Sequence, residues 1–238
     1  MTSVAEIFGI PTDNTELFTT ALTHPSYTKD LNMDYTECYE RLEFLGDSVL
    51  KLLISDLLFT KYPDYAEGEM SKIRSITVSD NTLSKIALHL GLDKLIRASV
   101  HDEKQGVTKL ESVTACAFEA VLGAYYLDGK FPELKNFAKA IFNPYIEEIE
   151  KHFEKYNAKA ILQEYTQSLT KETPVYKLIG TKGPEHHKTF EIEVSYRGEV
   201  IATGEGKTKK DAEQNAAYKA CQKLGAISVS YTHLRAHE

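Results

Sequence analysis

Apolar residues recur at intervals of three and four along most of the first two thirds of the chain. Such intervals are typical of amphipathic helices, because they place the apolar side chains on one face. Prolines, glycines and a polar stretch at residues 102–106 separate the periodic segments. The pattern predicts helices within residues 17–22, 42–59, 73–90, 113–127 and 137–153. Since no alternating β-branched segment interrupts them, we expect this region to be all-α.

The pattern changes after a charged and polar stretch at residues 150–157. A helical segment at 158–170 is followed by three segments that alternate as strands do, and then by a helix with Thr208 at its N-cap position. The strands are expected at residues 175–180, 190–196 and 200–203, and the last helix at residues 209–224. We therefore predict a multidomain chain, in which an all-α domain (residues 1–150) precedes a small α+β domain of order α-β-β-β-α (residues 157–226).

The last segment of the chain, residues 228–238, follows a helix that already ends at Gly225. It has no periodicity and carries two of the eight histidines. We interpret it as a non-native tail and leave it out of the functional argument.

Charge is distributed unevenly along the chain. The 238 residues carry a formal net charge of −7, yet residues 157–225 contain 11 Lys and Arg against 9 Asp and Glu. The C-terminal third is therefore mildly basic and the rest clearly acidic. This division suits a metal-dependent part joined to an anion-binding part.

The three cysteines, Cys38, Cys116 and Cys221, are far apart in the sequence. Their spacing argues against a disulfide framework or a zinc site, and favours a reducing, cytoplasmic environment. We see no signal peptide, and the longest apolar run is interrupted by Lys51 and Asp56. We expect a soluble protein that does not enter a membrane.

Three carboxylates, Glu40, Glu43 and Asp47, stand at steps of three and four within an otherwise apolar run. On a helix these steps place all three on one face, where they repel one another. We expect no Lys or Arg to share that stripe. A solvated acidic face is the ordinary alternative, but the surrounding apolar residues predict a mostly buried helix. The pattern therefore favours a site for a divalent cation.

A fourth carboxylate, Glu119, lies in a strongly apolar helical segment. An unpaired buried carboxylate is unfavourable. We expect Glu119 to share a cation with Glu43 and Asp47, although it could instead occupy the single polar stripe of its helix.

Four segments of the first domain resemble the signature motifs of ribonuclease III. They are residues 40–50 (ERLEFLGDSVL), 21–27 (ALTHPSY), 67–74 (EGEMSKIR) and 118–124 (FEAVLGA). The second domain resembles a double-stranded-RNA-binding domain in residues 162–165 (LQEY), 183–186 (GPEH) and 206–217 (GKTKKDAEQNAA). The resemblance covers nearly the whole chain up to Gly225, with the motifs in the expected order.

The resemblance implies a homodimeric, metal-dependent endoribonuclease that cuts both strands of double-stranded RNA in the processing of ribosomal and messenger RNA. Its products would carry 5′-phosphate and 3′-hydroxyl ends. Glu43 and Glu119 would hold Mg²⁺, with Mn²⁺ a possible substitute. Asp47 would help to position the metal and the attacking water, so that Asp47 and Glu119 are the expected catalytic residues. Glu40 and Glu67 would support the same acidic site.

The resemblance also implies which residues meet RNA. Proteins recognise an RNA duplex through its minor groove and its phosphates, because the major groove is deep and narrow. Gln163 and Glu164 would reach one minor groove, and a loop with His186 would reach the next. Three lysines near the start of the last helix would meet phosphates. They are Lys207, Lys209 and Lys210.

The chain departs from the family pattern at Cys116, where an acid normally precedes the second catalytic Glu by three residues. A thiol is a poor ligand for Mg²⁺. Water or another carboxylate could complete the metal site, the site could prefer Mn²⁺, or the chain could bind double-stranded RNA with weak or no cleavage. A structural role in a ribonucleoprotein is a further alternative. We expect retained cleavage, because the other matched acids are present.

Overall fold

The computed structural model describes residues 3–184 and 188–227. The chain divides into two compact units, Met1–Glu148 and Ile149–Glu238, which are described separately below. The predicted tail at residues 228–238 and the predicted RNA contact His186 both lie outside the described residues. Among the described residues, no helix is both long enough and apolar enough to cross a membrane.

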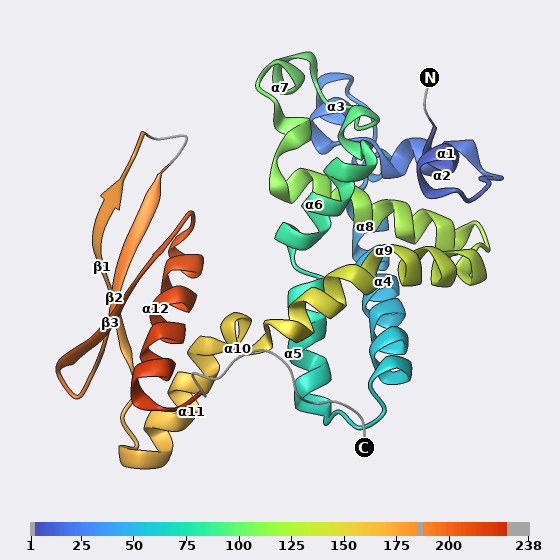
Figure 1. The fold of residues 1–238 in the computed structure, drawn as a ribbon. Coiled ribbons are helices and arrows are strands. Elements are labelled where there is room, and N and C mark those ends of the chain that lie inside the picture. The colour runs from blue at the N-terminus through green and yellow to red at the C-terminus, as the bar shows by residue number, and fades with distance from the viewer. Residues whose placement is uncertain (1–2, 185–187, 228–238) are drawn as a thin grey trace. The chain divides into compact units, whose positions relative to one another are not determined.

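The first unit is helical throughout the part that the structure describes (Figure 1). Its α-helices are α1 (Val4–Phe8), α2 (Thr15–Ala21), α3 (Pro25–Asp30), α4 (Glu40–Lys61), α5 (Glu67–Thr77), α6 (Asp80–Leu90), α7 (Val100–Lys104), α8 (Glu111–Leu127) and α9 (Phe131–Lys151). Short 3₁₀ helices are η1 (Tyr35–Glu37), η2 (Leu92–Lys94) and η3 (Val107–Lys109). The all-α prediction for this region is confirmed.

Two details of the helix prediction were wrong. Residues 73–90 do not form one helix, because Ser79 is extended (φ −73°, ψ 148°) and separates α5 from α6. The Ser79 hydroxyl donates to the carbonyl of Ile76 at 2.8 Å and holds this break in place. The helix predicted from residue 137 begins earlier, at Phe131, with Pro132 in its first turn, where the missing N–H has no intrahelical partner to lose.

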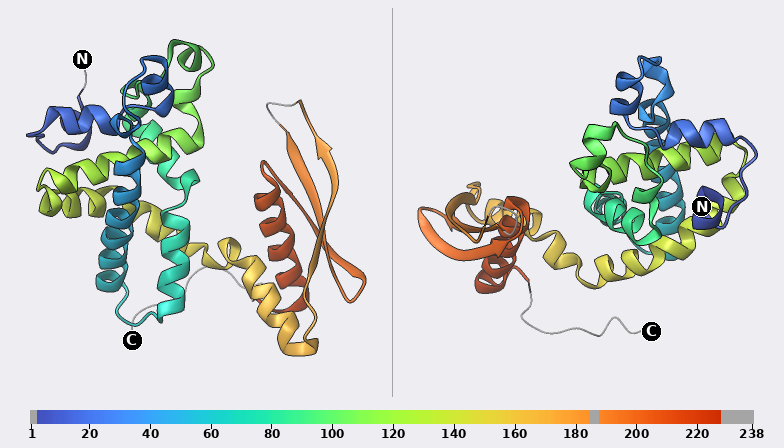
Figure 2. Two further views of the ribbon diagram at one scale, coloured as in Figure 1. Left: turned by 180° about the vertical axis from the view of Figure 1, so that it is seen from behind. Right: turned by 90° about the horizontal axis from the view of Figure 1, so that it is seen from above.

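The core of the first unit is built around α8. Eleven residues of this helix are buried, and Phe118 and Tyr125 are fully enclosed. The hydroxyl of Tyr125 donates to the carbonyl of Ile10 at 3.0 Å, which ties the N-terminal segment to the core. Figures 1 and 2 show α8 running across α4. These two helices carry the acids singled out in the sequence.

The second unit contains a three-stranded antiparallel sheet with helices on one face (Figures 1 and 2). Its elements are α10 (Phe153–Tyr156), α11 (Ala158–Thr170), β1 (Val175–Lys182), β2 (Thr189–Tyr196), β3 (Glu199–Gly206) and α12 (Lys209–Leu224). The strand order is β1-β2-β3, and Val194 of β2 pairs with Tyr176 of β1 and Ala202 of β3. The predicted α-β-β-β-α fold is confirmed.

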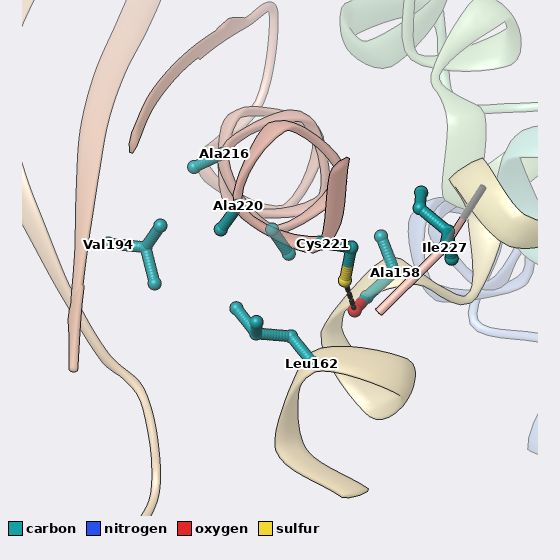
Figure 3. Packing of buried hydrophobic residues seen from close by; sticks show 8 residues of the cluster. Ala158, Leu162, Val194, Ala216, Ala220, Cys221 and Ile227 are labelled. Atoms are coloured by element: carbon teal, nitrogen blue, oxygen red, sulfur yellow. Dashed lines mark hydrogen bonds between the residues drawn. The ribbon is translucent and has the colours of Figure 1, made fainter. Parts of the chain in front are cut away.

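Small residues bring α12 close to the sheet. Its buried face presents Ala216, Ala220 and Cys221 to Val194 and to Leu162 of α11 (Figure 3). A methyl group added at Gly204 of β3 would lie 2.2 Å from the backbone nitrogen of Ala216, so only glycine fits there. This packing fixes the start of α12, where the predicted phosphate contacts stand.

Candidate functional site

The backbones of α4 and α8 touch where the two helices cross. A methyl group added at Gly46 would lie 1.8 Å from the carbonyl oxygen of Glu119, and one added at Gly123 would lie 2.4 Å from that of Leu42. Such an approach is possible only without side chains at both positions. Glu43 and Asp47 flank Gly46, so the crossing brings their helix face to Glu119.

A pocket of about 590 Å³ lies at this crossing. Four of the predicted site residues line it, together with Phe44, Lys51, Val78 and Asp80. The four are Glu40, Glu43, Asp47 and Glu119. The structure thus places carboxylates from α4 and α8 around one pocket.

The expectation that no cation shares the acidic stripe was wrong. Lys51 follows Asp47 by four residues on α4, and its Nζ lies 2.7 Å from Asp47 Oδ2. Both side chains are partly exposed, so the ion pair contributes little to stability. Even with this lysine, the pocket holds five carboxylates against one ammonium group.

Burial and this excess of negative charge both affect the pKa of Glu119. Burial, and then the neighbouring carboxylates Asp47, Glu43 and Asp80, raise its pKa from 4.5 to about 8, while Lys51 opposes the rise. Burial disfavours the charged form, and like charges add to that effect. A nearby divalent cation would have the opposite influence.

Cys116 faces the same group of acids. Burial, followed by a hydrogen bond to Glu43 and by the charges of Glu43, Glu119 and Asp80, raises the pKa of its thiol to about 12. The thiol therefore stays protonated at neutral pH and supplies no negative charge at the position of the family carboxylate.

The donor set fits a hard divalent cation in kind and in charge, because carboxylate oxygens predominate and negative charge is in excess. However, within residues 3–184 and 188–227 no three His, Cys, Asp or Glu side chains are arranged so that they could hold a metal ion together as they stand. Asp47 instead engages Lys51. Binding a cation here requires side-chain rotation within the pocket.

The fifth predicted acid, Glu67, does not line the pocket. It is exposed at the start of α5, where its carboxylate accepts a hydrogen bond of 2.6 Å from Ser71. Sequence reasoning missed Asp80, which does line the pocket. Treating residues 73–90 as one helix hid the fact that Asp80 begins a new one.

The predicted RNA-binding residues that the structure describes in the second unit are exposed. Gln163 and Glu164 lie on α11, and three lysines surround the start of α12. These are Lys207, Lys209 and Lys210. Thr208 caps α12 as predicted, its hydroxyl accepting from the backbone nitrogen of Asp211 at 3.1 Å. The lysines therefore surround the partial positive charge of a helix N-terminus.

Two family models match the chain. Residues 14–145 match the family described as Ribonuclease-III-like, and residues 158–224 match the double-stranded RNA binding motif. Together they span both units.

Relatives of known family align over almost the full length. Ribonuclease 3 of Staphylococcus haemolyticus is 40% identical over 216 residues, covering 91% of this chain and 88% of that protein. Ribonuclease 3 of a Staphylococcus aureus strain is 39% identical over 219 residues, covering 92% and 90%. In a structure described for flexibility in a region involved in dimer formation, the nuclease domain of Campylobacter jejuni ribonuclease III matches with a TM-score of 0.54 and 34% identity, covering 59% of this chain and 94% of that one.

The fold and the family matches together define a helical nuclease domain followed by a duplex-RNA-binding domain. The chain belongs to the ribonuclease III family. It is an endoribonuclease specific for double-stranded RNA.

Proposed function

We propose that this endoribonuclease works with Mg²⁺ held in the pocket at the α4–α8 crossing, and that its products carry 5′-phosphate and 3′-hydroxyl ends. The observation that carries the proposal is the gathering of Glu43, Asp47 and Glu119 around one pocket with more negative charge than Lys51 balances. When bound, Mg²⁺ neutralises charge on the scissile phosphate and makes a water molecule nucleophilic.

The chain's own residues have separate tasks in this proposal. Glu43 and Glu119 hold the ion from the two helices that cross at Gly46. Asp47, which is paired with Lys51 in this structure, would help to orient the ion and the water. Glu40, at the rim of the pocket, supports the site. For Glu67 we retain a supporting role as a proposal.

In this proposal the second domain binds the RNA duplex. We place Gln163 and Glu164 at a minor groove, where side chains reach the RNA-specific hydroxyls. Lys207, Lys209 and Lys210 meet phosphates beside the N-terminus of α12, where ammonium groups and helix dipole act in the same direction. His186, which follows β1 and precedes β2 in the sequence, completes the proposed set. We propose ribosomal and messenger precursors in the cytoplasm as substrates, and the free cysteines accord with a reducing compartment.

A cleavage assay tests the proposed activity. With Mg²⁺, the purified chain is expected to shorten long duplex RNA into fragments with 5′-phosphates and to spare a single strand of the same sequence. End-group analysis of the fragments provides the measurement. A gel shift without shortening, in Mg²⁺ and in Mn²⁺ alike, would instead show a protein that binds duplex RNA without cutting it.

We further propose that the protein is a homodimer formed through α4. Phe44 is 81% exposed, which is unusual for a large aromatic side chain. It lies at the rim of a second pocket of about 700 Å³, whose lining includes Leu17, Leu42, Leu45 and Leu127. A two-fold axis places the same surface of each copy against the other, so a protruding ring and an apolar pocket on one face suit a second copy.

Phe44→Glu is expected to turn the dimer into a monomer. Burying a charge in place of an aromatic anchor should weaken association by roughly a hundredfold or more. Size-exclusion chromatography with light scattering measures the result. Phe59→Glu is the matched control, because Phe59 is 74% exposed on the same helix and lines neither pocket. A Phe44→Glu variant that stays dimeric would refute this interface.

A further inference from the structure

The metal site proposed above lacks one carboxylate at Cys116. The thiol at this position is neutral and donates a hydrogen bond to Glu43, so it supplies neither charge nor an oxygen ligand. Sequence reasoning left open whether water or another carboxylate takes its place. The pocket itself offers a candidate from a third helix.

That candidate is Asp80, the first residue of α6. With Val78 it lines the same pocket as Glu43, Asp47 and Glu119. Among the described residues, its carboxylate has no hydrogen-bond or ion-pair partner. Asp80 is exposed, so its charge is solvated, and no described protein group would compete with a cation for this carboxylate.

The position of Asp80 is set by contacts on either side of it. Before it, the Ser79 hydroxyl donates to the carbonyl of Ile76. After it, the amide of Asn81 donates to Glu111 Oε2 at 3.1 Å, and the buried hydroxyl of Thr114 donates to that of Ser84 at 2.7 Å. The last two bonds join α6 to α8 in the turns before Cys116 and Glu119. The start of α6 is therefore held against the helix that carries the site.

The negative charge of Asp80 influences the pKa of both Cys116 and Glu119. Burial is the largest cause of the raised pKa of Cys116 and of Glu119, and the charge of Asp80 adds to it in each case. Asp80 and Glu119 also line the same pocket.

We propose that Asp80 supplies the carboxylate that Cys116 does not, so that the Mg²⁺ site of this chain draws its acids from α4, α6 and α8. This inference rests on the proposed metal-dependent function. It makes Asp80 a positioning residue for the ion, and it accounts for a family site that functions with a cysteine in place of an acid.

The test is a double-mutant cycle on the full chain, with Mg²⁺ binding measured by isothermal titration calorimetry. Asp80→Asn is expected to weaken binding by roughly tenfold or more. Cys116→Asp is expected to bind at least as tightly as the unchanged chain and to raise Mg²⁺-supported cleavage. In the double variant, the carboxylate introduced at position 116 should take over the lost role and return affinity to near the starting value.

Asp102→Asn is the matched control, because it removes a first-turn carboxylate of the same type, on α7, that does not line the pocket. Thermal unfolding in EDTA should be no lower for Asp80→Asn than for the unchanged chain, so weaker binding cannot be attributed to misfolding. Unchanged affinity of Asp80→Asn, or a double variant no better than it, would overturn the inference. If the unchanged chain bound no Mg²⁺, the proposed function itself would fail.

Discussion

Glu119→Gln is expected to lower Mg²⁺-dependent cleavage of duplex RNA by at least about a hundredfold, while RNA binding stays unchanged. The amide has the shape of the carboxylate but no charge to hold a cation. Glu119 joins the acids of α4 because the helix backbones touch at Gly46, and among the described residues it is the residue of α8 that lines the pocket. Binding is spared because the double-stranded RNA binding motif lies at residues 158–224.

The measurement is single-turnover cleavage, with a gel shift in Ca²⁺ or EDTA for binding. Glu103→Gln, which changes an exposed glutamate of α7 away from the pocket, should cleave normally. Cleavage by Glu119→Gln at the unmodified rate would exclude this pocket as the catalytic centre.

The same substitution has an expected effect on stability without metal. The pKa of Glu119 is raised to about 8 in the folded chain, from 4.5. The folded state therefore holds a proton that the unfolded state has lost, and stability falls as pH rises from about 4.5 to 8. In EDTA, Glu119→Gln should remove that part of the pH dependence and unfold at a higher temperature than the unchanged chain at pH 8.

The acids of α4 could be predicted from sequence because a helix fixes which residues share a face. Steps of three and four placed Glu40, Glu43 and Asp47 together, and all three line the pocket. The same rule places Lys51, four residues after Asp47, on that stripe. The position of this lysine was therefore predictable from the sequence.

Asp80 could not be found by periodicity. Its place depends on where α5 ends, and that is set by the side-chain hydrogen bond of Ser79 rather than by an interruption of the apolar pattern. The convergence of Glu119 with the acids of α4 depends on a long-range crossing of two helices. The sequence signal for it was a carboxylate among apolar residues. The close approach of the two helices at Gly46 and Gly123 explains how the structure brings Glu119 to the pocket.

Gly46→Ala is expected to destabilise the nuclease domain by about 3 kcal/mol or more, at the upper end of the effect of overpacking. Its methyl group would lie 1.8 Å from the carbonyl oxygen of Glu119, and this oxygen belongs to the backbone of a buried helix that cannot turn aside. The helices must separate or rotate. Either movement takes Glu119 away from Glu43 and Asp47, so the protein that remains folded should also lose affinity for Mg²⁺.

Gly68→Ala is the control for Gly46→Ala, because it introduces alanine into a helix without creating a close contact. Gly68 lies within α5, and an added methyl group meets nothing within 4 Å. Alanine there should stabilise by about 0.5–1 kcal/mol, because it restricts the unfolded chain more than glycine does. Urea unfolding of both variants measures the contrast. Two variants of equal stability would mean that α4 and α8 do not touch at Gly46, and the shared pocket would then lose its structural basis.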